Sequence, residues 1–265
     1  MKSDRIQEIR KLFLSRKKIT NTELCKTFDI SIETVRRDLN ILEKEGFIRK
    51  VYGGACLIEA QKEQPYVDKW TTRIDRNEDS KRCIAATAAS QIPDGATVFL
   101  DTGTTLYEIV PFLSQKQNLT ILTNSLRLAS AFGMYEHITV YCIGGLIKTD
   151  TLTATGFFAS EFLSYFSNID YAIVSCDGFL PEKGTTEYSI ELAMLKKQVL
   201  EKTGHIIALV DHSKFGISGN CLCCPTDSLD VLVTDASAPK EVLDTFCDTA
   251  CKVLIAPPVL PFNPL

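Results

Sequence analysis

The sequence has no long apolar run, no internal repeat and no low-complexity segment. None of its apolar stretches approaches the roughly 18 residues that a membrane-spanning helix needs. The first sixteen residues are charged and amphipathic, which is not the pattern of a secretory signal. These absences argue against a membrane-embedded protein, and we expect a cytoplasmic location.

Histidine and tryptophan are scarce, with three histidines and one tryptophan in the chain. The histidines are scattered, at 137, 205 and 212. Ten cysteines are many, and three of them lie together at 221–224, but no second ligand pair follows at zinc-finger spacing. Thiols stay reduced in the cytosol. We therefore expect free cysteines, no metal site and no cofactor.

The composition is that of a globular protein with an uneven charge distribution. Its 265 residues, 45 % of them hydrophobic, suffice for one large domain or two of ordinary size. The net charge is −4, yet residues 1–52 hold 13 Lys and Arg against 8 Asp and Glu, whereas the remainder holds 16 against 25. A basic module beside a larger acidic one is the distribution expected of DNA binding joined to a separate task.

The stretch 31–55, SIETVRRDLNILEKEGFIRKVYGGA, predicts a helix followed by a β-hairpin. Ser31 is a suitable N-cap and Gly46 a suitable end for the helix. Two apolar runs flank Gly53-Gly54, which predicts a two-residue turn. The apolar positions of the helix recur at helical spacing and predict one buried face. They are Val35, Leu39 and Leu42.

Basic and polar side chains lie outside this apolar face of the helix and on the hairpin. A helix fits the major groove of DNA, arginine can bind guanine through two hydrogen bonds, and cations on a wing can contact phosphate. A solvated charged helix beside a surface hairpin is the alternative. The candidate DNA-contacting residues are Ser31, Thr34, Arg36, Arg37, Asn40, Arg49, Lys50 and Tyr52.

Two more helices are predicted before this stretch. Apolar residues at 6, 9, 12 and 13 mark the first. Thr20 and Glu23 have the spacing of a capping box and open the second, and Asp29-Ile30 forms the turn that follows. Two short capped helices with a tight turn and a wing predict a winged helix-turn-helix over residues 1–58.

The remaining chain predicts a linker at 59–77 and an α/β domain at 78–256. The linker is polar, contains Pro65, and is expected to end by packing on the second domain. From residue 78 helices alternate with short apolar strands, which indicates a mostly parallel sheet with helices on both faces. One of the predicted helices covers 106–113.

Small, hydroxylated and charged residues follow the predicted strands. Ligands of such sheets bind beyond the carboxyl ends of the strands, where open N–H groups and lysines suit phosphate, and carboxylates and amides suit sugar hydroxyls. Each loop alone is also explained as an ordinary turn. The candidate effector-binding residues are Arg73, Asp101, Thr102, Gly103, Thr104, Thr105, Asn124, Ser125, Gly145, Lys148, Asp177, Gly178 and Lys214.

Residues 5–55 resemble the N-terminal domain of the DeoR/GlpR-type bacterial transcription regulators. The run TVRRDL at 34–39 and the wing ending in Gly53-Gly54-Ala55 carry the resemblance, with Tyr52 in place of the usual histidine. Residues 73–216 resemble the effector domain of the same family. The matching positions are Arg73, Lys81, DTGTT at 101–105, TNS at 123–125, Gly144-Gly145, Asp177-Gly178 and DHSKFG at 211–216.

The resemblance implies a Rossmann-like effector domain related to ribose-5-phosphate isomerase and a transcription regulator, usually a repressor, that senses a phosphorylated sugar. Lys148 stands where arginine is frequent, and Ser175-Cys176 replaces the commoner Gly-Ala. The implied partners are operator DNA, a sugar phosphate and further copies of the chain. The alternative is a sugar-phosphate isomerase-like enzyme with an accessory DNA-binding domain, in which Asp101, Asp177 and Lys214 transfer protons.

Overall fold

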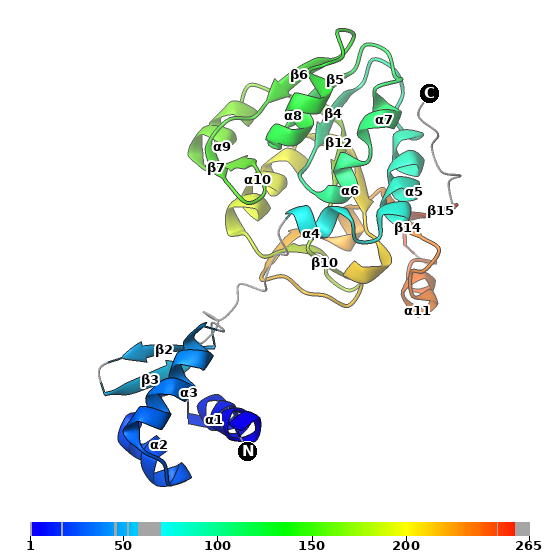
Figure 1. Ribbon diagram of the computed structural model, residues 1–265. Helices are drawn as coiled ribbons and strands as arrows, with labels where there is room; N and C mark the ends of the chain where they lie inside the picture. The colour runs from blue at the N-terminus through cyan, green and yellow to red at the C-terminus, as the bar shows by residue number, and fades with distance from the viewer. Residues whose placement is uncertain are drawn as a thin grey trace, which may run out of the picture. The chain divides into compact units, whose positions relative to one another are not determined.

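The structure of the chain, a computed structural model, describes residues 2–16, 18–44, 47–51, 53–57, 70–247 and 249–257. The chain divides into two compact units, Met1–Tyr66 and Val67–Leu265, both drawn in Figure 1. Each unit is described by itself. In the described part of the chain, no helix is both long and apolar enough to cross a lipid bilayer.

The first unit packs three helices against a small antiparallel sheet. Its elements are α1 Lys2–Arg16, β1 Lys18–Thr20, α2 Asn21–Phe28, α3 Ile32–Lys44, β2 Ile48–Val51 and β3 Gly54–Leu57. The predicted apolar faces of the helices meet in one core. It buries Ile9, Phe13, Leu24, Val35, Leu39 and Leu42. The predicted winged helix-turn-helix is confirmed, and β1 is a strand that the sequence analysis did not predict.

Local capping sets the helix ends in this unit. The predicted capping box is present, because the Thr20 hydroxyl accepts from the N–H of Glu23 and the Glu23 carboxylate accepts from the N–H of Thr20. Asp29 ends α2 in the left-handed conformation, with φ of 49°. The chain then enters α3, where the Ser31 hydroxyl accepts from the N–H of Thr34 at 3.4 Å, as expected of an N-cap.

The hairpin turn lies one residue earlier than predicted. Val51 pairs with Gly54, so residues 52–53 connect the two strands and Gly54 belongs to β3. The reason is the unpredicted strand β1, which pairs with β3. A Cβ atom on Gly54 would lie 2.4 Å from the backbone oxygen of Ile19. Gly54 is therefore required by the close approach of two strands rather than by the turn.

The second unit is built on a seven-stranded sheet of order β15-β14-β12-β9-β4-β5-β6, in which every neighbouring pair is parallel. Its strands are β4 Thr97–Leu100, β5 Thr120–Thr123, β6 Thr139–Cys142, β9 Ile169–Val174, β12 Thr203–Leu209, β14 Val231–Asp235 and β15 Lys252–Ala256. This confirms the predicted parallel sheet. Its strand order reverses between β4 and β9, and such a reversal is where open α/β sheets bind ligands.

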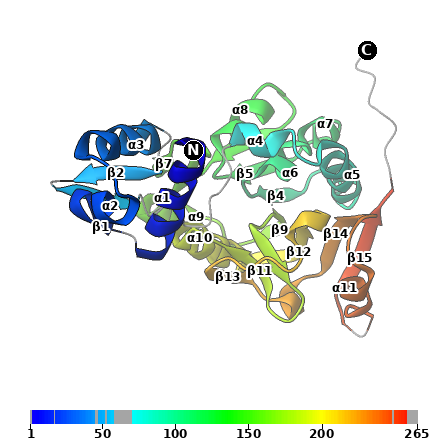
Figure 2. The ribbon, with the colours of Figure 1, turned by 60° about the horizontal axis from the view of Figure 1, so that its bottom comes forward.

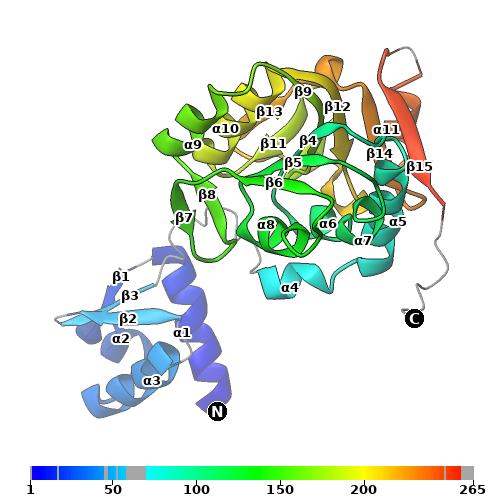
Figure 3. The same ribbon diagram turned by 90° about the horizontal axis from the view of Figure 1, so that it is seen from above.

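Alternation along the strands sends side chains to both faces of this sheet. Val98 and Leu100 of β4 join one apolar core, whereas Phe99 joins the other. Both faces are covered by helices, as Figure 3 shows. On the first face lie α5 Glu78–Ala89, α6 Thr104–Tyr107, α7 Val110–Leu113 and α8 Leu126–Phe132. On the second lie α9 Phe157–Leu163 and α10 Ile190–Leu200, with Phe246 after α11 Lys240–Asp244.

The helix predicted over 106–113 is wrong in one respect, because it is two four-residue helices, α6 and α7. Pro111 lies in the first turn of α7, where its missing N–H costs nothing, and it prevents one continuous helix. Two small antiparallel sheets were not predicted, since their strands are short. They are β7 Leu146–Lys148 with β8 Thr153–Thr155, and β10 Gly178–Leu180, β11 Gly184–Glu187 and β13 Cys221–Cys224.

The end of the expected linker is a structured part of the second unit. Residues Trp70–Ile74 form α4, which packs beside α6, as Figure 2 shows. The Trp70 ring meets Tyr107 edge to face, with centroids 5.7 Å apart, and the guanidinium of Arg127 lies over it at 4.6 Å. The boundary between the units therefore falls at residues 66–67, and the second unit begins before residue 78.

Replacing Gly54 by alanine should loosen the first unit without affecting the second. The added methyl group would meet the backbone of β1, and overpacking of this kind costs about 1–3 kcal/mol. Hydrogen exchange of the full chain should therefore quicken in peptides covering 18–57, and stay unchanged in β4 and β9. Gly53→Asn is the matched control, because Gly53 has a positive φ of 79° that asparagine tolerates and open space around it. Equal exchange in both variants would contradict the role of Gly54.

Candidate functional site

The helix α3 buries one face and exposes the polar residues predicted to contact DNA. Arg36, Arg37 and Asn40 are exposed, while Asp38, in the same run, is buried. The Asp38 carboxylate accepts from the guanidinium of Arg5 on α1, with Nε at 2.7 Å and Nη2 at 3.3 Å. This ion pair fixes α3 against α1, so the outward direction of the two arginines is set by the core.

The wing is tied to α3 by Glu43. Its carboxylate accepts from the backbone N–H of Lys50 at 3.1 Å and pairs with the Lys50 ammonium at 3.1 Å. These contacts hold the pKa of Glu43 below its usual range. The same ammonium donates to Oδ1 of Asn40. Two of the predicted DNA-contacting residues, Asn40 and Lys50, therefore lie side by side on one surface.

Ser31 and Thr34 lie at the start of α3, where their hydroxyls are hydrogen-bonded to each other at 3.1 Å. Arg49 belongs to β2, but its side chain is outside the described part of the structure. Tyr52 and the predicted helix end at Gly46 also lie outside the described residues.

In the second unit, Asp101 and Ser175 lie on the two sides of the switch point between β4 and β9. The Asp101 carboxylate accepts from the N–H of Ser175 at 3.1 Å, and the Ser175 hydroxyl donates to the Thr102 carbonyl at 2.7 Å. A Cβ atom on Gly103 would lie 2.7 Å from the Ser175 hydroxyl. The loops that follow β4 and β9 are thus joined at the carboxyl edge of the sheet.

A buried lysine that was not predicted lies beneath these loops. Lys196 of α10 is 3 % exposed, and its ammonium is 2.6 Å from the Asp101 carboxylate and bonded to the Glu187 carboxylate and the Ser175 carbonyl. Burial alone would lower the pKa of Lys196, but Asp101 and Glu187 outweigh it and raise that pKa well above its ordinary value. A charged lysine here links α10, β11 and the ends of β4 and β9.

Glu187, which is bonded to Lys196, favours its protonated form. Burial raises its pKa to about 8, with Lys196 opposing and the negative charges of Asp177 and Asp101 adding to the rise. Burial would also raise the pKa of Asp177, but the hydrogen bond from Glu187 and the charge of Arg73 hold it below its usual range.

Three cations meet at the same edge. The guanidinium of Arg73 is 3.7 Å from the Asp177 carboxylate. Lys81, only 5 % exposed, donates to the Arg73 carbonyl. Burial lowers the pKa of Lys81, Asp211 opposes this, and the charges of Arg73 and Lys214 lower the pKa further. Lys214 lies in the segment that follows β12, and its positive charge acts on Lys81 together with that of Arg73.

The loop after β5 meets the hairpin β7–β8. The Asn124 amide donates to the Ala154 carbonyl at 3.2 Å, and the Thr102 and Thr153 hydroxyls are 3.0 Å apart. Ser125 caps α8 through the N–H of Leu128. Within the described residues, Oδ1 of Asn124 and Oδ1 of Asp101 are buried without a hydrogen-bond partner.

Several other residues predicted to bind the effector make contacts with nearby parts of the protein. A Cβ atom would lie 2.4 Å from the Thr155 oxygen at Gly145 and 2.3 Å from the Ile217 oxygen at Gly178. Both glycines therefore permit close backbone contacts. The Lys148 ammonium donates to the Ser189 hydroxyl at 2.7 Å and to Glu191 at 3.2 Å. Thr104 and Thr105 are buried in α6, which has four residues and so offers a weaker helix dipole than expected.

Family models match both units of the chain. Residues 5–61 match the DeoR-like helix-turn-helix domain, and residues 76–236 match the DeoR C terminal sensor domain. The chain belongs to the DeoR family of transcriptional regulators.

Relatives of this DeoR-family regulator match it nearly end to end. The HTH-type transcriptional regulator IolR of Bacillus subtilis is 37 % identical, over 91 % of this chain and 94 % of its own length. The glycerol-3-phosphate regulon repressor of Escherichia coli is 30 % identical, over 87 % and 89 %. Among solved structures, ribose 5-phosphate isomerase A of Methanocaldococcus jannaschii matches 52 % of this chain and 55 % of its own, with 19 % identity and a TM-score of 0.39. A likeness at that level carries no argument about chemistry.

Lys196 and Glu187 are the residues of the regulator's cluster that sequence reasoning missed. A signal for Lys196 exists, because it lies four residues after Leu192 and three before Val199, on the buried stripe of α10. A lysine at such a position requires a buried counter-charge. For Glu187 no comparable signal exists, since β11 is short and all four of its residues are buried.

The cysteines of the regulator show no sign of metal binding. All ten are free, and the described residues contain no group of three side chains placed to hold a metal ion. Cys223 and Cys224 lie on β13, and burial raises the pKa of each thiol to about 12. Thiols with such pKa values are poor nucleophiles at neutral pH.

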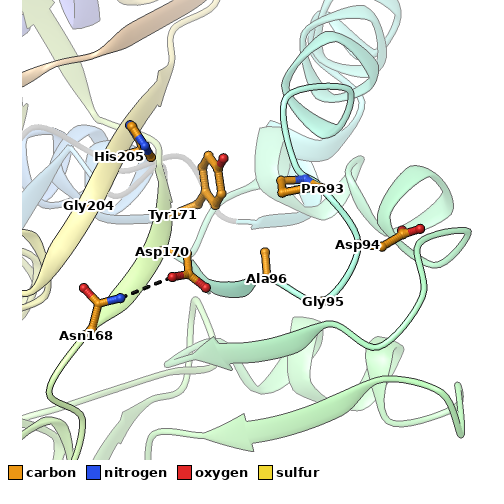
Figure 4. A pocket seen from close by; sticks show the side chains of 9 residues that line it. All are labelled: Pro93, Asp94, Gly95, Ala96, Asn168, Asp170, Tyr171, Gly204 and His205. Atoms are coloured by element: carbon orange, nitrogen blue, oxygen red, sulfur yellow. Dashed lines mark hydrogen bonds between the residues drawn. The ribbon is translucent and has the colours of Figure 1, made fainter.

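A shallow hollow of about 440 Å³ lies at the opposite edge of the sheet, at the amino ends of β4, β9 and β12 (Figure 4). Its two carboxylates already have protein partners, because Asp170 accepts from the N–H of Thr97 and from Asn168, and Asp94 accepts from the N–H of Gln117. The charged groups that could hold an anion are at the carboxyl edge instead.

Replacing Glu187 by glutamine should flatten the pH dependence of stability of the second unit. Folded Glu187 keeps its proton up to a pKa of about 8, whereas the ordinary value is 4.5. Between these values the folded state binds more protons than the unfolded state, so stability falls as the pH rises, by at most about 1.4 kcal/mol per pH unit. Glu187→Gln should lose this slope.

Denaturant unfolding followed by fluorescence of the single tryptophan, Trp70, measures this slope. Glu182→Gln, on an exposed turn, is the control and should keep it. If the difference in stability between the parent and Glu187→Gln does not change between pH 4.5 and 8, Glu187 does not keep its proton in the folded state.

Proposed function

We propose that this DeoR-family regulator acts in the cytoplasm as a repressor of sugar-metabolism genes, and that a phosphorylated sugar bound at the carboxyl edge of the seven-stranded sheet releases it from DNA. The observation that carries the proposal is the meeting of three cations, Arg73, Lys81 and Lys214, at an edge that also presents buried acceptors without partners.

The cations support a phosphate as one part of the ligand. A phosphate ester carries about −1.5 to −2 charges at neutral pH, and it is bound by arginine and lysine. The charges of Arg73 and Lys214 lower the pKa of Lys81, so these like charges raise each other's energy in the free protein. A bound dianion would relieve this repulsion, which provides affinity specific for the phosphorylated form.

The buried acceptors support a polyhydroxylated carbon chain as the other part of the ligand. Oδ1 of Asp101 and Oδ1 of Asn124 are buried without partners among the described residues, and such atoms normally find a donor. Sugar hydroxyls are suitable donors, and Asp177 adds an ionised carboxylate beside them. The name of the glycerol-3-phosphate regulon repressor, a relative, supports a small phosphorylated polyol or sugar as the class of effector.

On the DNA side, the exposed Arg36 and Arg37 of α3 support base contacts, and Lys50 on the wing supports a phosphate contact. One chain presents one recognition helix, which contacts one half-site. Regulators of this kind pair half-sites through symmetric assembly, so we propose a homo-oligomer as the working form.

A sugar-phosphate isomerase-like enzyme is the second candidate, because Asp101, Asp177 and Lys214 lie at one edge. The charges argue against it. The pKa of Asp177 is held below its usual range, so Asp177 is not matched to proton transfer at neutral pH. Asp101 is fully buried and ion-paired with Lys196, which gives it a structural contact. A turnover assay over a panel of sugar phosphates separates the two proposals, since sustained turnover would favour the enzyme.

Arg37→Ala should cost about 1–3 kcal/mol of binding to specific DNA if Arg37 contacts a base, while Lys50→Ala should weaken all DNA alike and reduce the salt slope by about one. Gel shifts on a sequence selected by the full chain from a random pool, and on scrambled DNA, measure both. Lys240→Ala, on α11 of the second unit, is the control. If Arg36→Ala and Arg37→Ala both bind selected DNA like the parent, α3 is not the recognition helix.

Asp177→Ala should leave DNA binding intact and abolish the response to ligand, and Lys214→Ala should weaken phosphorylated ligands more than the corresponding free sugars. The reason is that a ligand shifts the population of DNA-competent states only by its differential affinity for them. Titrating protein–DNA complexes with sugar phosphates, each beside its unphosphorylated form, measures the response. Lys252→Ala is the control here, because Lys252 is exposed at the amino end of β15, at the opposite edge of the parallel sheet.

Circular dichroism and thermal melting must first show that both variants are folded, since Asp177 also accepts from the N–H of Tyr188. Folded variants that respond like the parent at every ligand concentration would place the ligand elsewhere.

A further inference from the structure

The second unit exposes six large apolar side chains on three neighbouring elements. Each is between 45 % and 74 % exposed. We call them the apolar patch. They are Leu146 and Ile147 on β7, Phe157 and Phe158 on α9, and Ile190 and Met194 on α10.

The structure brings the three elements that carry these six side chains together. Leu146 pairs with Thr155, so one end of β7 lies beside the start of α9. Lys148, at the other end of β7, donates to Ser189 and Glu191, so that end lies beside the start of α10. The helices α9 and α10 also contact each other. Figures 1, 2 and 3 all show β7, α9 and α10 gathered at one place.

The patch is larger than the surface of a stable monomer normally tolerates. Aromatic side chains have about 150–250 Å² each. With about 190 Å² taken for each of the six residues, their exposed fractions add up to a total of roughly 700 Å². The largest apolar patch of a typical monomer is about 300–600 Å². A standard protein–protein interface buries about 800 Å² on each partner. The area therefore suits one interface of standard size.

The chemistry of the patch suits a second copy of the same chain. Its six side chains carry no charge, so two such patches placed face to face bury no unpaired ionic group. The charged pair Lys148–Glu191, 3.2 Å apart, lies at its border and provides a polar rim. An isologous contact uses the same surface on both partners, and pairing two chains provides the two recognition helices that paired half-sites require.

We propose that the apolar patch on β7, α9 and α10 is the surface through which two copies of this chain pair. The inference deepens the proposed function, on which it rests for the need of two recognition helices. Its test uses neither DNA nor ligand, so its failure can be told apart from failure of the DNA-binding or sensing proposals.

Sedimentation equilibrium of the full chain, over a concentration series, measures the pairing. The parent should be a dimer or a multiple of it. Phe158→Glu on α9 and Met194→Glu on α10 should each raise the dissociation constant by about 30-fold or more, the effect of losing one central side chain of an interface. Because both side chains are mostly exposed, neither substitution should disturb folding, which Trp70 fluorescence checks.

Ile255→Glu on β15 and Met134→Glu after α8 are the matched controls. Both replace exposed apolar side chains, at 52 % and 81 %, that lie outside the patch, and both variants should pair like the parent. A parent that stays monomeric at every concentration would overturn the proposal. So would patch variants that pair as well as the controls, because another surface would then hold the copies together. If the parent is monomeric and the patch variants speed hydrogen exchange in residues 2–57, the chain's own first unit covers the patch.

Discussion

The buried ammonium of Lys196 is the contact on which the sensor unit depends. It binds Asp101, Glu187 and the Ser175 carbonyl, and so it joins the two strands of the switch point to α10 and to a small sheet. A charge removed from water requires compensation, and here two acids and a carbonyl provide it. Burial raises the pKa of Glu187, and the negative charges of Asp177 and Asp101 add to the rise although Lys196 opposes it, so the protonated form of Glu187 is favoured beside Asp177.

This arrangement separates the groups that support the fold from the groups available to a ligand. One oxygen of Asp101 is used by Lys196 and Ser175, while the other is buried without a partner among the described residues. Arg73, Lys81 and Lys214 repel one another, and their repulsion is tolerated because Asp177 and Asp211 lie among them. An edge that combines spare acceptors with crowded cations suits an anionic, hydroxylated molecule better than it suits acid–base catalysis.

The DNA-binding unit is stabilised by different interactions from those of the sensor unit. It is a small core held by capping signals and by the ion pair of Arg5 with Asp38 between α1 and α3. Its sheet is completed by β1, which approaches β3 so closely that residue 54 must be glycine. The wing is then tied to α3 by Glu43. The contacts of Asp38 and Glu43 fix the orientation of α3, and neither of them uses Arg36 or Arg37.

The sequence alone determined the winged helix-turn-helix, its capping box, the parallel sheet and the loops that follow the strands, because helical and strand periodicities and caps are local signals. Tertiary structure decided the rest. The turn moved to residues 52–53 because β1 pairs with β3, and helix 106–113 broke at Pro111. The cluster of Lys196 and Glu187 depends on residues that are up to 95 positions from Asp101 in the sequence, and no local period reports such a contact. The strand order, the meeting of Arg73 with Asp177 and the joining of β7, α9 and α10 into one surface likewise come from packing between distant segments.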